Sequence, residues 1–157
     1  MWIRIALCLG LVTVASVTWS AVERETFDVS VTIPTQDFYV LPVDPQLVQR
    51  TQQLPYNPVT AQLSPLRAQY DVKNAAGSIG ARLAEAAFLS NGYERIDLRV
   101  TFNEVQLSLD QSEILDSAQA RPGRRVNLEI AAVKPADDYA PGNYHGTVHM
   151  LFDAIAP

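Results

Sequence analysis

Residues 26–33 read Thr-Phe-Asp-Val-Ser-Val-Thr-Ile, and polar and apolar side chains alternate along the whole stretch. In a β-strand successive side chains point to opposite faces, so this segment has one apolar face and one polar face. The apolar face consists of Phe27, Val29, Val31 and Ile33. The stretch therefore predicts a half-buried strand whose apolar face must be covered by a sheet.

The residues ahead of this strand have the features of a secretory signal peptide. Arg4 supplies a positive charge, and residues 5–17 form an almost unbroken apolar run. As a helix the run would span about 20 Å, short of the ~30 Å hydrocarbon core, which favours a cleaved leader over an anchor. The small residues Thr18 and Ser20 suit cleavage after Ser20. The strand at 26–33 would then lie near the new N-terminus, with no earlier strand as its hairpin partner.

Composition limits what the exported chain does. Roughly 137 residues remain after the leader, enough for one domain with a hydrophobic core. Cys8 is the only cysteine and lies in the leader, so a disulfide scaffold is excluded. The whole chain has a formal net charge of -5, which argues against nucleic acid or another polyanion as a partner.

Further alternating segments follow, separated by turn-forming residues such as Asn91-Gly92 and Asn103-Glu104. Short strands with turn signals about every ten residues are typical of an antiparallel β-sandwich. We therefore expect an all-β, immunoglobulin-like fold. Its expected strands are residues 38–43, 66–72, 79–83, 96–100, 105–109, 126–130 and 144–152, with residues 54–58 as an edge strand or extended turn.

One segment also fits a helix. Residues 80–89 could form about two helical turns, but the alternation of Ile79, Ala81 and Leu83 favours a strand, or a strand running into irregular chain. Ile114 and Leu115 fall in a more polar stretch, which we interpret as a connector.

Residues capable of catalysis or metal binding are sparse. His145 and His149 could share a metal on a helix, but on a strand they would lie about 13 Å apart, too far to chelate one ion. Asp137 and Asp138 are expected in a solvated loop. The chain contains no Gly-x-Ser-x-Gly motif, phosphate-binding loop or Gly-x-Gly-x-x-Gly motif. The sequence therefore predicts no enzyme, no cofactor and no metal site.

A small basic cluster lies at a predicted turn. Arg121, Arg124 and Arg125 surround Pro122 and Gly123. We expect a solvated turn there, with a contact site for acidic groups as the alternative.

The two ends of the chain are complementary. The expected last strand has Tyr144, Val148, Met150 and Phe152 on one face, and only a few residues follow it. A seven-strand sandwich ordinarily closes this edge with one more strand. The residues thus predict an incomplete sandwich, missing its last strand, whose acceptor groove receives the 26–33 strand of a neighbouring copy. Such a head-to-tail contact generates filaments, and strand addition of this kind is known as donor-strand complementation.

Several segments also carry a family resemblance. They are Val22-Glu23 before the first strand, Leu54-Pro55-Tyr56-Asn57-Pro58, Val72-Lys73-Asn74, Leu98-Arg99-Val100, and Ala140-Pro141-Gly142-Asn143-Tyr144-His145-Gly146-Thr147-Val148. The Gly-Asn-Tyr-x-Gly part of the last segment is the most distinctive. In these segments the chain resembles the colonisation-factor (CS-one) type fimbrial major subunits of the alternate chaperone–usher pathway.

The resemblance implies cleavage after Ala21, and hence a signal peptide at 1–21, a donor-strand extension at 22–34 and a pilin domain at 35–157. It also implies export, a periplasmic chaperone, an outer-membrane usher, and homopolymerisation by donor-strand exchange into surface fimbriae that mediate adhesion. Phe27 and Asp28 stand where the family would have aliphatic and small polar residues. The alternative function is a minor or tip-associated adhesin or carbohydrate-binding module, although tip adhesins usually carry a second domain.

Overall fold

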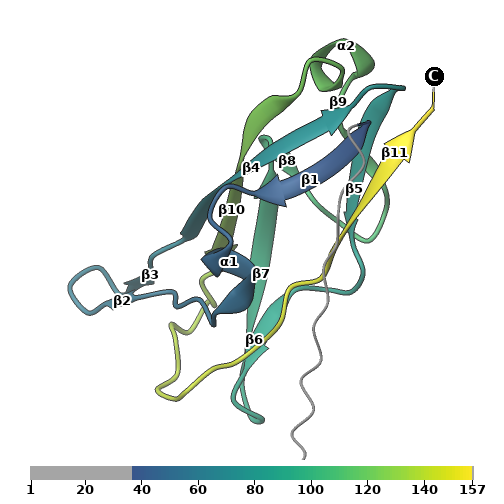
Figure 1. Cartoon of the computed structure of the whole chain (residues 1–157). Coiled ribbons are helices and arrows are strands. Elements are labelled where there is room, and N and C mark those ends of the chain that lie inside the picture. The colour runs from purple at the N-terminus through teal and green to yellow at the C-terminus, as the bar shows by residue number, and fades with distance from the viewer. Residues whose placement is uncertain (1–36, 157) are drawn as a thin grey trace, which may run out of the picture. The chain divides into compact units, whose positions relative to one another are not determined.

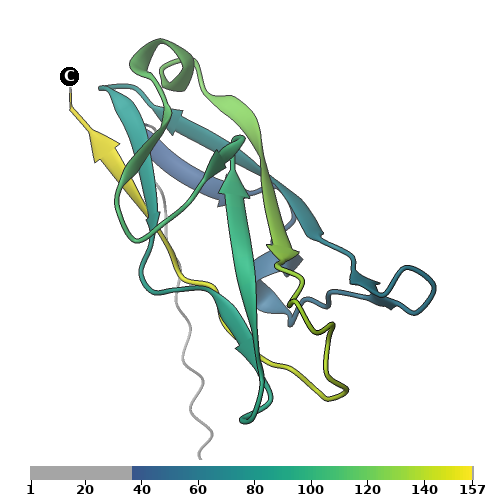
Figure 2. The same ribbon diagram turned by 180° about the vertical axis from the view of Figure 1, so that it is seen from behind.

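Strands dominate residues 37–156, the part of the chain that the computed structural model describes. Two antiparallel sheets pack face to face, as Figures 1 and 2 show from opposite sides, and a short two-stranded hairpin extends from them. In chain order the elements are β1 (Phe38–Pro42), α1 (Gln46–Gln49), β2 (Tyr56–Asn57), β3 (Gln62–Leu63), β4 (Leu66–Asn74), β5 (Ser78–Leu83), β6 (Phe88–Ser90), β7 (Arg95–Phe102), β8 (Val105–Gln106), β9 (Ser112–Leu115), α2 (Ser117–Ala120), β10 (Arg124–Ala132) and β11 (Met150–Ile155).

The larger sheet has the strand order β1-β4-β10-β7-β6, with β8 beside β7. Its strands alternate in burial because one face covers the core and the other faces solvent. On β10, for example, Val126, Leu128 and Ile130 are buried, whereas Arg125 and Asn127 between and beside them are exposed.

The smaller sheet has the order β11-β5-β9. Its middle strand, β5, is buried over almost its whole length, as a strand covered on both edges should be. The turn that leads into β5 is held by Asn74, whose buried Nδ2 donates a hydrogen bond to the Ser78 carbonyl at 2.7 Å. On the far side, Asn103 Nδ2 donates to the Ile114 carbonyl at 2.6 Å and ties the β7–β8 turn to β9.

The strand order corresponds to that of a constant-type immunoglobulin domain, in which strands A-B-E-D form one sheet and C-F-G the other. Here β1, β4, β10 and β7 occupy the A, B, E and D positions, and β5 and β11 occupy C and F. Among residues 37–156 no strand occupies the G position beside β11.

The core lies between the two sheets. Its largest fully buried side chains include Phe102 of β7, Ile79 of β5 and Leu115 of β9. Three aromatic rings cross the sandwich: the ring centroids of Tyr70 and Phe102 are 5.3 Å apart, and those of Phe102 and Phe152 are 4.9 Å apart. Phe152 therefore connects the last strand of the smaller sheet to the centre of the core.

The predicted class of fold, an all-β antiparallel sandwich, is confirmed. Residues 80–83 are strand running into irregular chain at 84–87, as favoured over the helix, and residues 88–89 begin the next strand, β6. The interpretation of Ile114 and Leu115 as connector was wrong: they belong to β9, and both are buried. The two short helices were not predicted.

The predicted strand at residues 144–152 was wrong at both ends, since β11 runs from Met150 to Ile155. Earlier in this segment His145 pairs with Ser90 of β6, in the larger sheet, whereas β11 pairs with β5 in the smaller one. The chain between them passes from one sheet to the other, so a continuous ladder cannot form. The predicted signal peptide at 1–21 and the extension at 22–34 lie outside the described residues.

Candidate strand-acceptor site

β11 runs along one edge of the smaller sheet. It pairs antiparallel with β5 in a regular register, with Met150 opposite Leu83, Phe152 opposite Ala81 and Ile155 opposite Ser78. Among the described strands, β5 is the only neighbour of β11. An outer strand carries backbone N–H and C=O groups along its second side that an added strand can pair with.

Three of the predicted acceptor residues lie on the inner side of this segment. Val148, Met150 and Phe152 are partly buried and pack against the core cluster. Leu151, between them, points the other way and is 39% exposed. The alternation predicted for residues 148–152 is therefore present, and its apolar face is directed at the core.

Tyr144, the fourth predicted acceptor residue, is not on β11. Its hydroxyl donates a hydrogen bond to the Ala140 carbonyl at 2.9 Å, so this side chain belongs to the loop ahead of the strand. The structure thus brings Val148, Met150 and Phe152 together and leaves Tyr144 apart from them. The proposed donor residues Phe27, Val29, Val31 and Ile33 fall outside the described residues.

Two glycines allow the C-terminal segment to approach its neighbours closely. A Cβ at Gly146 would collide with the Phe88 carbonyl oxygen. A Cβ at Gly77 would collide with the Ile155 carbonyl oxygen, at the other end of β11. The second glycine of the Gly-Asn-Tyr-x-Gly motif, Gly146, is therefore required by a backbone contact.

The larger sheet also has an outer strand, β1, in the A position. This strand is the outermost of the path through the larger sheet and pairs with β4 from Phe38 opposite Asn74 to Pro42 opposite Tyr70. Phe38 and Val40 are partly buried and pack against the core, like the inner residues of β11. Both outer strands thus present half-buried apolar side chains.

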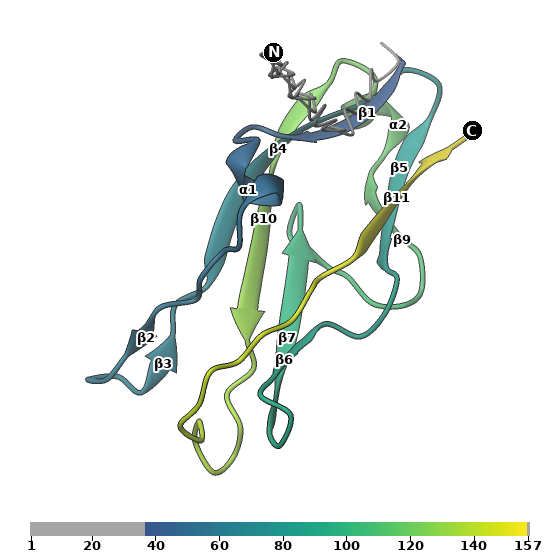
Figure 3. The same ribbon diagram turned by 60° about the horizontal axis from the view of Figure 1, so that its bottom comes forward.

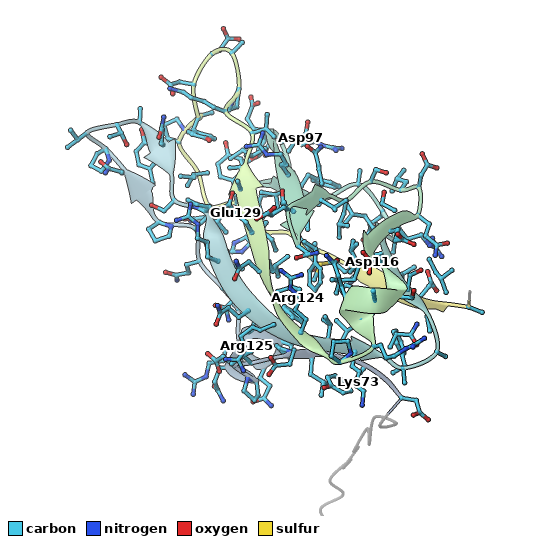
Figure 4. The ribbon with its side chains drawn as sticks, turned by 90° about the horizontal axis from the view of Figure 1, so that it is seen from above. Lys73, Asp97, Asp116, Arg124, Arg125 and Glu129 are labelled. Atoms are coloured by element: carbon cyan, nitrogen blue, oxygen red, sulfur yellow. The ribbon has the colours of Figure 1, made fainter. Side chains whose placement is uncertain are left out.

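The outer face of the larger sheet is polar and internally paired. Arg125 Nε and Nη2 donate to the two carboxylate oxygens of Asp71 at 2.8 and 2.9 Å, and Arg67 Nε lies 2.8 Å from Glu129 Oε2. Figure 4 shows Arg125 and Glu129 on this sheet. The hydrogen bond from Arg125, assisted by its charge, holds the pKa of Asp71 below its usual value. Arg125 is therefore neutralised within the sheet, unlike its neighbours in the predicted basic turn.

The described residues include no cluster of three or more metal-binding side chains. His145 and His149 are both exposed, and His149 Nδ1 lies 3.2 Å from Glu85 Oε1. Asp138 pairs with Lys134 at 3.0 Å in the loop that follows β10. The two helices of the described part are far too short to cross a membrane.

This strand order defines the class of protein: an immunoglobulin-like β-sandwich. The particular family follows from the sequence, because the model of the CS1 type fimbrial major subunit matches residues 23–153, and the chain belongs to that family. The family resemblance predicted from the motifs is thereby confirmed.

The structure is similar to the CooA pilin subunit from enterotoxigenic Escherichia coli, with a TM-score of 0.56 and 16% sequence identity. The similarity covers 73% of this chain and 86% of that chain, and at this identity it establishes a shared fold. No curated protein matches the sequence. Family and fold together identify a fimbrial subunit, a structural component that assembles with other pilin subunits at the cell surface.

Proposed function

We propose that this subunit polymerises head to tail by donor-strand exchange into adhesive surface fibres. Residues 22–34 of one subunit add as a strand beside β11 of the next. Phe27, Val29, Val31 and Ile33 then complete the apolar layer that Val148, Met150 and Phe152 begin. The neighbour is another copy of the same chain.

The observation that supports this proposal most directly is the neighbourhood of β11. It occupies the F position of an immunoglobulin-like sandwich, and β5 is its only described neighbour. Its inner residues are only partly buried, whereas the inner residues of β10 are fully buried. A strand in the G position would pair with the second side of β11 and cover those residues.

The energetics suit a subunit that needs its neighbour. Burying four large apolar side chains contributes about 1.5–3 kcal/mol each, or roughly 6–12 kcal/mol in total as an upper estimate. A whole domain is typically stable by only about 5–15 kcal/mol. A subunit without its donor strand is therefore marginally stable and prone to aggregate at the open edge.

Because the subunit is marginally stable before it receives a donor strand, it needs a periplasmic chaperone. The leader at residues 1–21 directs export, the chaperone covers the acceptor edge, and an outer-membrane usher releases the subunit into the growing fibre. No step involves a cofactor, metal ion or nucleic acid.

A self-complemented subunit tests the proposal. Residues 22–34 are removed from the N-terminus and fused after residue 157 through a four-residue linker, with a scrambled segment as the matched control. We expect a soluble monomer whose melting temperature is well above that of the control and that accepts no neighbour. Equal melting temperatures for the two proteins would show that β11 has no place for an added strand.

A further inference from the structure

The two ends of the described domain have different chemistry. One end, here called the turn end, holds the β4–β5 turn at residues 74–78 and the α2–β10 turn at residues 121–124. Asp37 and Ile155 also lie at this end, because the Asp37 carbonyl accepts from Ala75 N at 2.7 Å and Ile155 pairs with Ser78. The chain therefore enters the described domain at the same end at which β11 finishes.

The opposite end, here called the loop end, holds three exposed segments: the β2–β3 hairpin, the β6–β7 turn at residues 91–94 and the loop at residues 133–145. Figure 3 shows them side by side, and two contacts join them. The rings of Tyr56 and Tyr139 meet edge to face, with centroids 6.2 Å apart, and the Asn91 side chain lies against Gly142.

The turn end presents cations that have no ion pair within the described part of the chain. Arg125 is neutralised by Asp71, but no carboxylate partners Lys73, Arg121 or Arg124. The α2–β10 turn packs against β4, so that Gly123 lies beside Lys73. Figure 4 views the domain from this end, with Lys73 and Arg124 labelled.

Two carboxylates at this end, Asp116 and Asp37, form no ion pair with these cations within residues 37–156. Asp116 caps α2 by accepting a hydrogen bond from Gln119 N at 2.8 Å. Asp37 lies at the start of β1, and no described ion pair links it to a cation. The three cations are thus available to a partner.

The loop end presents large side chains in defined positions. Tyr93 is 96% exposed at the tip of the β6–β7 turn, and Val59 is 92% exposed at the tip of the β2–β3 hairpin. The turn is held by Asn91 Oδ1, which accepts hydrogen bonds from Tyr93 N at 2.9 Å and Glu94 N at 2.7 Å. Tyr93 and Glu94 therefore stand on a tip that is ordered before any contact is made, which lowers the entropic cost of binding.

The direction of the added strand decides which ends meet. Every described strand pair is antiparallel, and the G strand of an immunoglobulin-like sandwich runs antiparallel to strand F. β11 runs from the loop end to the turn end, so the donor segment runs from the turn end to the loop end and leaves the acceptor there. The donor's own domain begins at Asp37, at its turn end.

On the basis of the proposed function, we infer that the loop end of each accepting subunit docks on the turn end of the subunit that donates the strand. Tyr93 and Glu94 of one copy then meet Lys73, Arg121 and Arg124 of the next. An aromatic face and a carboxylate are both favourable partners for guanidinium and ammonium groups. Charge complementarity of this kind chiefly sets the orientation and the rate of association. This second contact fixes how successive subunits are oriented about the donor strand.

Site-specific cross-linking tests the contact. A photoreactive phenylalanine analogue replaces Tyr93 in fibres, with the same analogue at Asn127, on the outer sheet face, as the control position. We expect the probe at 93 to join two copies and to map to the 121–124 turn or to Lys73. Cross-links from 93 to any other surface, or none in fibres that assemble normally, would overturn the inference and leave donor-strand exchange standing.

Charge reversal supplies a second test in the same fibres. We expect Arg121→Glu with Arg124→Glu to slow polymerisation by about tenfold at low salt, and adding Glu94→Lys to restore part of the rate. Arg50→Glu with Arg99→Glu changes the net charge equally, away from the turn end, and serves as the control. Equal rates for the two double variants would contradict the contact. Failure of the unaltered subunit to polymerise would instead count against donor-strand exchange itself.

Discussion

β10 and β11 both direct apolar side chains from alternate positions at the core, but their surroundings are very different. β10 lies between β4 and β7, and its inner residues Val126, Leu128 and Ile130 are at most 8% exposed. β11 has β5 alone among the described strands, and its inner residues Met150 and Phe152 are only partly buried. Alternation therefore specifies a strand and its inner face, whereas the number of neighbouring strands decides how completely that face is buried.

The largest effect, a loss of polymerisation, is expected from a substitution in residues 22–34, the strand that we propose as the missing neighbour of β11. Val31→Asp would place a charge in the apolar layer, at a cost of several kcal/mol, and should abolish polymerisation. Ser30→Asp, on the polar face of the same segment, should polymerise normally. Electron microscopy and sedimentation of both variants check this. Long fibres from Val31→Asp would show that residue 31 faces away from the acceptor.

A pair of truncations tests the comparison between β10 and β11 directly. Leu128→Ala should lower the free energy of unfolding by about 2–5 kcal/mol, since it leaves a cavity in a closed core. Met150→Ala should cost less in the isolated subunit, because Met150 is only partly buried there. In the self-complemented subunit the loss for Met150→Ala should grow, while that for Leu128→Ala stays the same. Denaturant unfolding measures all four values, and an unchanged Met150→Ala loss would argue against strand addition beside β11.

A smaller effect, on the stability of the subunit, is expected at Gly146, which lies close to the Phe88 backbone. Gly146→Ala brings a methyl group against the Phe88 carbonyl and should cost about 1–3 kcal/mol as the two backbones separate. Thr147→Ala, at the exposed neighbouring position, should change stability little. Thermal unfolding of both variants decides, and an unaffected Gly146→Ala would mean that the 144–149 segment moves freely relative to β6.

The smallest effect is expected on the solvent side of β10. The pKa of Asp71 is lowered chiefly by the hydrogen bond from Arg125. A carboxyl with a lowered pKa stabilises the fold above its unfolded pKa, near 3.9, and the contribution is lost as the pH falls through the folded value. Asp71→Asn should therefore melt slightly below the unaltered protein at pH 7 and at the same temperature near pH 2. A difference that persisted at pH 2 would assign the stabilisation to packing.

Much of the fold was predictable because local signals agreed with the tertiary structure. Alternation located β4, β7 and β10, whose inner residues face one core. Asn91-Gly92 and Asn103-Glu104 form turns, and the positive φ of Gly92 and Asn103 is what their residue types indicate. Glu104 also has a positive φ, which its residue type does not indicate. The basic turn was also located, although its division into a paired Arg125 and unpaired neighbours depends on Asp71, which is remote in sequence.

The class of fold, most of the strand-forming segments and the family could be read from the amino-acid sequence, because these depend on side-chain periodicity and on short motifs. The place of Tyr144, the start of β11 at Met150 and the membership of Ile114 and Leu115 in a sheet became visible only in the folded chain. Each of these depends on which distant backbone lies alongside. His145 meets β6 in one sheet and Met150 meets β5 in the other, so an alternating segment that looks continuous in sequence is divided between two sheets.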